Sequence, residues 1–197
     1  RIFVIGQGTA AVAGDSVADS LAAELAGTGI WVEALPATEL SGFGLAADMS
    51  DVLAVAISQS GTTTDTNRTV DLVRARGGRV VAIVNRRNSD LTDRADGVLY
   101  TSDGRDVEMS VASTKAFYGQ VVAGFLLAAA LADAAGAPGA PDRAALLAGL
   151  RTLPDAGMAA LINVSHVRNM ERGLRELGCL NVVLGGLTVW LSTQHRY

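Results

Sequence analysis

Short apolar runs alternate with longer segments of helical pattern through the first two thirds of the chain. The apolar runs predict five β-strands, over residues 1–6, 30–35, 52–58, 80–84 and 98–101. The segments that follow these runs predict helices over residues 9–26, 39–47, 62–76, 89–95 and 113–135. Continuous apolar strands separated by helices are typical of a parallel sheet that is covered on both faces. The pattern therefore predicts a doubly wound α/β fold, a three-layer α/β/α sandwich around a five-stranded parallel sheet.

The chain changes in character after the last of these helices. AGAPGAPDR, at 135–143, is rich in alanine, proline and glycine and is interpreted as a linker. Two helical patterns follow at 143–151 and 157–177, and LNVVLGG at 180–186 returns as a strand and a glycine turn. We therefore expect three parts: a ligand-binding domain at 1–136, a linker with connector helices at 137–178, and the apparent start of a second, truncated unit at 179–197.

Composition narrows the class of protein. Of the 197 residues, 49% are apolar and 18% are charged, which is typical of a globular protein with a buried core. The net charge is −4 without a cluster of Lys and Arg, which excludes a nucleic-acid binder. The longest apolar run, 121–132, is shorter than the roughly 20 residues that span a bilayer, so it predicts a buried helix rather than a membrane anchor.

The cysteine count and the start of the chain add two expectations. Cys179 is the single cysteine, which excludes an internal disulfide, and no Cys/His spacing suggests a zinc site. We therefore expect a cytoplasmic protein without a metal or cofactor. Arg1 already lies inside an apolar strand, so the sequence is interpreted as a piece of a longer chain.

The residues that follow the third predicted strand carry the strongest chemical signal. They read SQSGTTTDT, at 58–66, with six hydroxyl side chains. In open α/β sheets, ligands bind at the carboxyl ends of strands, beside helix N-termini that favour anions. Gly61 lets the backbone approach closely, and the side chains of Ser58, Gln59, Ser60 and Thr63 can donate hydrogen bonds to one phosphate. Each hydrogen bond to a charged group contributes about 1.5–3 kcal/mol, so three or four could hold a phosphorylated metabolite.

Helix capping is the structural alternative for the same hydroxyls. Ser and Thr are ordinary N-cap residues, and Thr62 with Asp65 three positions later is close to a capping box. Capping explains one or two hydroxyls but not six. The interpretation therefore favours phosphate binding.

Two separated segments resemble a known family in the right order. ISQSGTTTDT, at 57–66, and VASTKAF, at 111–117, resemble the two signature segments of the sugar isomerase (SIS) domain, and in particular the isomerase half of the glucosamine-6-phosphate synthase family. Weaker similarities are GQGTA at 6–10, ATEL at 37–40 and RTLP at 151–154. The resemblance covers about residues 1–186. It implies the strand order 2-1-3-4-5 and a phosphorylated sugar of the fructose 6-phosphate or glucosamine 6-phosphate type as ligand.

The resemblance also implies a set of ligand contacts. They are Thr9, Ser58, Gln59, Ser60, Gly61, Thr63, Val111 and Ser113. Ala10 departs from the family, which commonly has a sugar-contacting serine at this position, so the identity of the sugar phosphate stays open. The family's base glutamate, imine-forming lysine and ring-opening histidine fall outside this chain, so we expect binding without full turnover. The long apolar helix at 113–135 further suggests pairing with a second SIS unit or a twofold mate.

Several other side chains are candidate chemical groups. Lys115, in the first turn of a helix, is equally consistent with a nearby anion and with solvent. Three roles are open for Glu39: a general base, a contact to a neighbouring subunit, and a structural hydrogen-bonding group. We favour the structural role. We favour non-catalytic roles, such as solvent exposure, helix capping or ordinary packing, for the remaining candidates. They are Glu108, His166, Cys179 and His195.

Two other functions compete with that of a sugar-phosphate enzyme. GQGTAA at 6–11 is close to the G-x-G-x-x-A fingerprint of dinucleotide-binding proteins, with Glu33 at the end of the second strand as a ribose ligand. That function leaves the hydroxyl loop and VASTKAF unexplained. A non-catalytic sugar-phosphate sensor uses the same domain for recognition alone, although no basic helix-turn-helix segment is present in the sequence.

Overall fold

The computed structural model describes residues 1–102 and 115–162. The chain divides into two compact units, residues 1–140 and a second unit that begins at Pro141. The predictions that fall outside the described residues are those for Glu108, Val111, Ser113, His166, Cys179, His195 and the second unit expected at 179–197.

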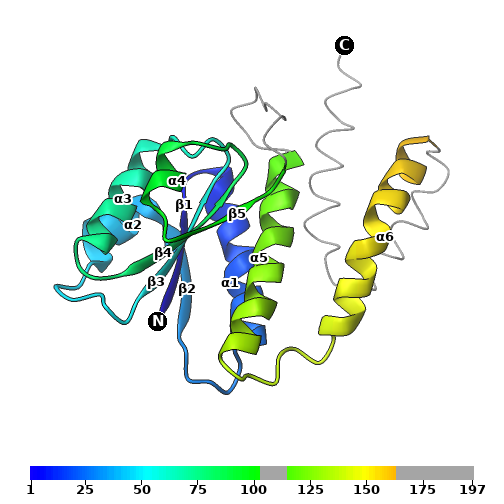
Figure 1. The fold of residues 1–197 in the computed structure, drawn as a ribbon, viewed down its shortest axis with the longest axis horizontal. Helices are drawn as coiled ribbons and strands as arrows, with labels where there is room; N and C mark the ends of the chain where they lie inside the picture. Colours follow the sequence, from blue (N-terminus) through cyan, green and yellow to red (C-terminus); the bar gives the residue numbers. More distant parts are fainter. Residues whose placement is uncertain (103–114, 163–197) are drawn as a thin grey trace, which may run out of the picture. The chain divides into compact units, whose positions relative to one another are not determined.

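Five parallel strands form one sheet in the first unit (Figure 1). They are β1 (Ile2–Gly6), β2 (Val32–Pro36), β3 (Leu53–Ser58), β4 (Arg79–Val84) and β5 (Gly97–Tyr100). The strand order is β2-β1-β3-β4-β5. Both the parallel sheet and the order 2-1-3-4-5 are confirmed.

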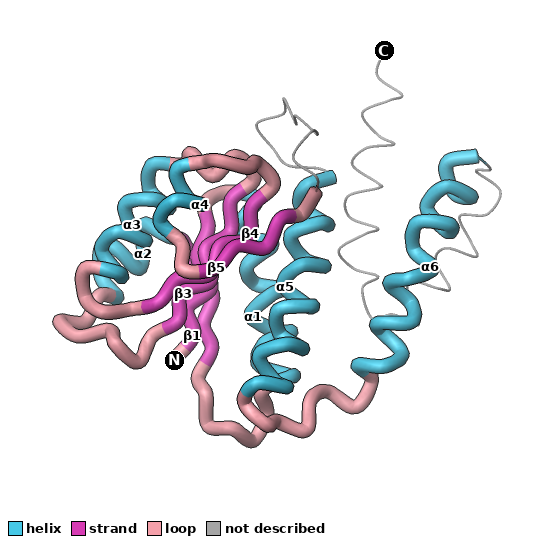
Figure 2. Tube along the Cα trace, in the orientation of Figure 1, coloured by secondary structure: helices cyan, strands magenta, loops and turns pink. Residues whose placement is uncertain are grey.

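Helices cover both faces of the sheet (Figure 2). They are α1 (Thr9–Glu24), α2 (Ala37–Glu39), the π-helical turn η1 (Leu40–Gly44), α3 (Thr64–Arg74), α4 (Asp90–Arg94) and α5 (Lys115–Ala134). α1 and α5 lie side by side on one face, and α2, α3 and α4 lie on the other (Figure 1). The predicted three-layer sandwich is therefore confirmed.

The alternation of side chains along the strands produces two buried clusters. Toward α1 and α5 the sheet presents branched residues such as Val55 and Ile57, which pack against Val17 of α1. Toward α3 it presents small residues, Ala54 and Ala56 among them. Burial of apolar surface stabilises the folded state by about 25 cal/mol per Å². The two buried clusters therefore stabilise the sheet, and with it the positions of the strand ends.

The long helix α5 is strongly apolar. By length and composition, Ala116–Ala134 could cross a membrane, with a mean hydropathy of 1.5 over its most apolar stretch. Half of that stretch is buried in the protein, and the close fit of α5 on α1 leaves no room for a side chain at Gly124, whose added Cβ would lie 2.7 Å from Cγ1 of Val17. A core helix of a globular domain passes the same test, so α5 is weak evidence for a membrane span.

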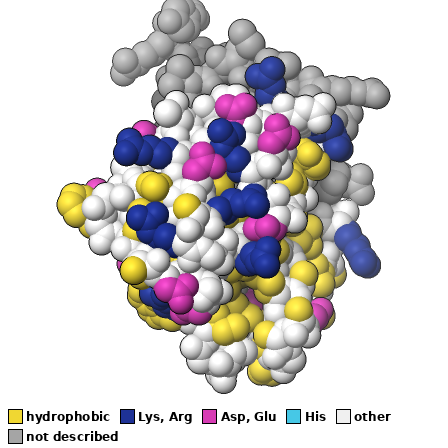
Figure 3. All heavy atoms as spheres, turned by 60° about the vertical axis from the view of Figure 1, so that its left-hand side comes forward, with side chains coloured by type: hydrophobic (Ala, Val, Ile, Leu, Met, Phe, Trp, Pro, Cys, Tyr) yellow, Lys and Arg dark blue, Asp and Glu magenta, His cyan; other side chains and the backbone are white. Residues whose placement is uncertain are grey.

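Charged side chains of both signs are interspersed on the face that carries α2, α3 and α4 (Figure 3). Two ion pairs lie on this face. Arg94 of α4 pairs with Asp71 of α3 at 3.1 Å, and Arg79 of β4 pairs with Asp96 at 3.3 Å. This mixture differs from the single-sign basic surface that nucleic-acid binding requires.

The helices differ from the sequence prediction in two places. The expected helix at 39–47 is instead the short α2 followed by η1. In the second unit, α6 (Arg143–Ile162) is one continuous helix where two were expected at 143–151 and 157–177. Pro154 cannot donate a backbone hydrogen bond, but a single missing bond does not end a helix whose other residues favour it.

Candidate functional site

The first turn at the carboxyl edge of the sheet connects β1 to α1. It consists of Gln7 and Gly8, and α1 begins at Thr9. Gly8 has φ 59°, which glycine adopts without strain, and a Cβ at Gly6 would lie 2.8 Å from the backbone of Ala10. The two glycines therefore let α1 start directly above the strand, which leaves Thr9 half-buried at the edge of the sheet.

The second turn connects β3 to α3 and contains the hydroxyl loop, residues 58–63. β3 lies next to β1, with Ala56 opposite Ile5. Their helices leave to opposite faces, α1 to one and α3 to the other (Figure 1). The two turns therefore flank the switch point of the sheet, where open α/β sheets bind ligands. Thr9 and the hydroxyl loop therefore lie at the same edge of the sheet.

Hydrogen bonds inside the hydroxyl loop fix its shape. The Oγ of Ser58, which is buried, accepts a hydrogen bond from the Gly61 N–H at 3.0 Å and lies 3.4 Å from the Oγ1 of Thr63. The Oγ of Ser60 accepts from the Thr62 N–H at 3.2 Å and pairs with the Thr62 Oγ1 at 2.9 Å. Part of the hydroxyl capacity is thus used to order the loop, while each hydroxyl that accepts can still donate its own proton.

The structure does not contain the capping box of Thr62 and Asp65 that was the alternative for the hydroxyl loop. α3 begins at Thr64, so its N-cap is Thr63 rather than Thr62. Within the described part of the chain, the Thr63 side chain makes no capping hydrogen bond. The first-turn N–H groups of α3 therefore remain available to a ligand, and the positive end of the helix dipole adds about 0.3–1 kcal/mol for an anion. Asp65 in the same turn is exposed and acts against an anion.

Hydrogen bonds from α3, from α4 and from the turn between β4 and α4 hold the backbone of the hydroxyl loop. The carbonyl of Gly61 accepts hydrogen bonds from the Asn67 Nδ2 at 3.2 Å and the Leu91 N–H at 3.0 Å. The carbonyl of Gln59 accepts from the N–H groups of Asn85 and Arg86 at 3.2 and 3.3 Å. The turn between β4 and α4 therefore holds the loop in place, a role that the sequence analysis missed.

Buried polar atoms gather behind this loop and the first turn. In the described residues, the Oγ of Ser89, the Oδ1 of Asn67 and the Oε1 of Gln7 are buried without a hydrogen-bond partner. The Nε2 of Gln7 donates to the Oγ1 of Thr38 in α2 at 3.3 Å. Unsatisfied buried groups are rare in folded proteins and often accept water or ligand atoms.

Two arginines also stand at this edge and were not considered in the sequence analysis. Arg86 and Arg87 follow β4, and both are exposed. The guanidinium of Arg87 lies 4.3 Å from the ring centre of Tyr100 at the end of β5, a cation–π contact. This edge of the sheet therefore carries positive charges as well as hydroxyl groups. In the sequence, this pair of arginines follows the fourth apolar run after one residue, Asn85.

The remaining candidates lie elsewhere or outside the described residues. Glu33 is the second residue of β2, which continues to Pro36, so it lies away from the carboxyl edge and cannot serve as the expected ribose ligand at the strand end. Glu39 is exposed in α2 and lines a hollow on the outer side of the sheet. The backbone of Lys115 opens α5, whereas Val111 and Ser113 are not described.

Several curated proteins that are similar to this chain are named glutamine–fructose-6-phosphate aminotransferase. The glutamine–fructose-6-phosphate aminotransferase of Corynebacterium diphtheriae is 39% identical over 125 residues, which are 63% of this chain and 20% of that protein. The same enzyme of Symbiobacterium thermophilum is 47% identical over 103 residues, 52% of this chain and 17% of the relative. The chain therefore matches about a fifth of the length of these curated relatives.

A solved structure agrees with these relatives in fold. The C-terminal domain of glucosamine-fructose-6-phosphate aminotransferase from Francisella tularensis superposes with a TM-score of 0.70 at 26% identity, over 86% of this chain and 47% of that one. Residues 1–130, which include both turns, match the SIS domain family. On the agreement of family match, relatives and fold, this chain belongs to the SIS domain family.

Proposed function

We propose that the crevice between the β1–α1 and β3–α3 turns binds the phosphate of a phosphorylated sugar. The observation that carries the proposal is the hydroxyl loop itself: a clamped turn, ordered by Ser58 and Ser60, at the N-terminus of a helix whose N-cap side chain makes no capping bond. The proposed contacts are Thr9, Ser58, Gln59, Ser60, Gly61 and Thr63, together with Val111 and Ser113 beyond the described residues.

The phosphate lies over the hydroxyl loop and the sugar extends toward Thr9. The hydroxyls of Ser60 and Thr63 donate to the phosphate oxygens, and the first-turn N–H groups of α3 bind the same anion. The orphaned buried oxygen of Gln7 offers an acceptor for a sugar hydroxyl at the other side of the crevice. Ala10 is buried and contributes no hydrogen bond, so this chain makes one sugar contact fewer than a serine at that position allows.

The chain acts as the first isomerase unit of a ketose/aldose phosphate isomerase or aminotransferase. The named relatives support this role, since they are fructose-6-phosphate aminotransferases of which this chain matches one part. Interconversion of aldose and ketose phosphates moves a proton between adjacent carbons, which needs a general base and acid beside a fixed phosphate. In this proposal the chain fixes the phosphate, a second SIS unit or a twofold mate supplies the base, and the protein works in the cytoplasm.

Isothermal titration tests the proposal. Fructose 6-phosphate and glucosamine 6-phosphate should bind, and unphosphorylated fructose should not. Ser60→Ala and Thr63→Ala should each weaken binding by about 1–3 kcal/mol, since each removes a hydrogen bond to a charged group. Ser20→Ala is the matched control, because its hydroxyl donates to the Ser16 carbonyl within α1 at 2.9 Å, away from the turn. Unchanged affinity in both loop variants would place the site elsewhere.

A further inference from the structure

A fully buried glutamine, Gln120, lies in the second turn of the apolar helix α5. Its neighbours on the same stripe of the helix, one turn away on either side, are the buried Ala116 and Ala123. The Oε1 and Nε2 of Gln120 are both buried, and neither has a hydrogen-bond partner in the described part of the chain. In Gln7 and Asn67, by contrast, one atom of the amide is bonded.

The burial of an amide without partners is unfavourable for the fold. It loses its hydrogen bonds to water and gains none in the protein, whereas an apolar side chain of the same shape would have no such cost. The rest of the buried stripe of α5 consists of alanine and leucine. Side chains that act against stability are typical of functional sites, where the missing partner arrives with the ligand.

The direction of α5 shows where this amide points. Gly119, near the start of the helix, lies against Thr101, which directly follows β5 at the carboxyl edge of the sheet. Further along, Gly124 lies against Val17 in the middle of α1. The helix therefore runs away from the carboxyl edge, parallel to α1. Since helical side chains lean toward the N-terminus of their helix, the Gln120 amide is directed toward the carboxyl edge.

The facing helix provides room on this path. Because Gly124 lies against Val17, Gln120 lies one turn earlier, at the level of Ala13 in α1. Ala13 is small and completely buried, and Thr9 begins α1 one turn above it. The Gln120 amide is therefore directed to the level of Thr9, on the side of the sheet that α1 and α5 cover.

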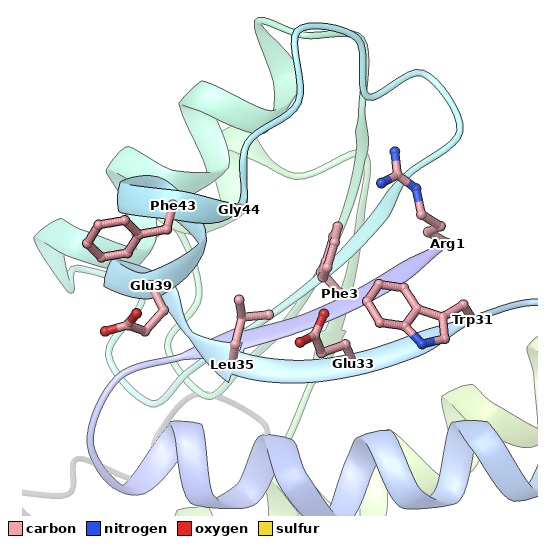
Figure 4. Close-up of a pocket in the computed structure, with 8 residues that line it drawn as sticks. All are labelled: Arg1, Phe3, Trp31, Glu33, Leu35, Glu39, Phe43 and Gly44. Atoms are coloured by element: carbon pink, nitrogen blue, oxygen red, sulfur yellow. The ribbon is translucent and has the colours of Figure 1, made fainter.

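The hollow beside β2 belongs to the other face of the sheet (Figure 4). Two of the residues that line it, Phe3 and Leu35, pack into the cluster beneath α3. Gln120 belongs to the face that α1 and α5 cover, because its neighbour Ala123 is part of the cluster there. A ligand of the Gln120 amide therefore comes from the carboxyl edge and not from this hollow.

We propose that Gln120 binds the sugar part of the phosphorylated ligand. This inference rests on the proposed function, in which the sugar extends from the hydroxyl loop toward Thr9. An amide offers one acceptor and one donor group side by side, so it can accept a hydrogen bond from one hydroxyl and donate to the next. The ligand class is therefore a phosphate ester whose carbon chain carries hydroxyls on adjacent carbons, and the phosphate itself is bound without Gln120.

Titration of two phosphate esters tests the contact. Gln120→Met keeps the length and nearly the volume of the side chain and removes both polar atoms. Its affinity for fructose 6-phosphate should fall about tenfold, because two neutral hydrogen bonds are lost. Ethyl phosphate, which has no hydroxyl on its carbons, should bind the variant and wild type equally. Leu127→Met is the matched control, because Leu127 lies two turns further along the same buried stripe and should leave both affinities unchanged.

Urea unfolding without ligand separates a ligand contact from a structural role. Gln120→Met should unfold at higher urea concentration than wild type, because the unpaired amide is gone, whereas a structural amide would make the variant less stable. Lower stability of the variant, or unchanged affinity for fructose 6-phosphate, would overturn the inference. So would equal binding of the two esters by wild type, although the proposed phosphate site would then stand. If wild type binds neither ester, the proposed function itself is wrong.

Discussion

The side chain of Ser89 occupies the space that a side chain at position 61 would need. A Cβ built on Gly61 would lie 2.6 Å from the Cβ of Ser89 and 3.1 Å from the Cγ2 of Val84, and Gly61 has φ 67°. The hydroxyl loop and the start of α4 are therefore fitted together without spare volume. Ser89 is the N-cap of α4, so the position of that helix and the shape of the loop depend on each other.

Gly61→Ala should disrupt the loop. The left-handed backbone costs a non-glycine residue about 1–2 kcal/mol, and overpacking against Ser89 adds about 1–3 kcal/mol. We expect a loss of stability of about 2–5 kcal/mol in urea unfolding, together with loss of sugar-phosphate binding in titration. Gly97→Ala is the control, because the nearest side-chain atom to an added Cβ there is the Val81 Cγ2 at an ordinary 3.7 Å.

A second substitution separates the clash from the backbone strain. Ser89→Gly removes the Cβ and Oγ of Ser89 and leaves the Val84 Cγ2 in place, so Gly61→Ala with Ser89→Gly should recover most of the overpacking part and keep the strain. Equal stability of the single and the double variant would show that Ser89 does not limit position 61.

Asn67→Asp should weaken sugar-phosphate binding without any change in the hydroxyls. Asn67 is buried, and its Nδ2 donates to the Gly61 carbonyl. A carboxylate at that place has no proton to donate and faces the carbonyl oxygen, which costs about 1–3 kcal/mol for the unsatisfied buried group. Titration of the Asp variant beside Asn67→Ala tests this, and binding by the Asp variant as tight as wild type would contradict it.

The sheet was predictable because its signal is local. Apolar runs such as 52–58 are continuous, so the number of strands and their parallel arrangement follow from the pattern. The strand order needed the family resemblance. The segment after β2 was less predictable, because Gly42 and Gly44 interrupt the helical pattern and the chain forms α2 and η1 in place of one longer helix.

The hydroxyl loop was found from the sequence, whereas its supports were not. Asn85 follows another strand, and its contact with the loop depends on the sheet register, which pairs Ser58 with Val84. One local signal was present: Asn67 stands three residues before Val70, on the buried stripe of α3. A polar residue at such a position needs a partner, and the loop supplies it. The prediction of Glu33 as a ribose ligand was wrong because β2 extends to Pro36. Glu33 pairs with Phe3 near the start of the strand, away from the carboxyl edge.

Arg86→Gln should reduce the affinity for the phosphate of the ligand. Arg86 follows β4 at the carboxyl edge, and its backbone N–H bonds to Gln59 in the hydroxyl loop. An exposed charge within reach of an anion contributes up to about 1 kcal/mol, and salt screens this contribution. We expect roughly fivefold weaker binding at low salt, with the difference from wild type falling as salt is raised.

A second arginine on the same strand provides the control for this effect. Arg79 opens β4 at the opposite, amino edge of the sheet and bonds to Asp96 there. Arg79→Gln makes the same change of charge far from the crevice, so its affinity should equal that of wild type. If both variants bind equally weakly, the effect reflects the net charge of the protein and not the position of Arg86.

Asp96 should make the stability of the first unit depend on pH in the acid range. Its carboxylate accepts a hydrogen bond from the Val80 N–H at 2.8 Å, and this bond, assisted by Arg74 and Arg79, lowers the pKa of the carboxyl below its ordinary value. A carboxyl with a lowered folded-state pKa stabilises the protein above its unfolded pKa of about 3.9 and loses that contribution as the pH falls through the folded-state pKa.

Asp96→Asn should therefore be less stable than wild type at pH 7 by about 1 kcal/mol, since the group is partly exposed. The difference should shrink as the pH falls below about 4, because the wild-type carboxyl then becomes neutral too. Urea unfolding at a series of pH values measures this. Arg79→Gln should retain most of the pH dependence, because the Val80 N–H is the largest cause of the shift. Parallel curves for wild type and Asp96→Asn from pH 7 to pH 3 would show that this carboxyl is not linked to folding.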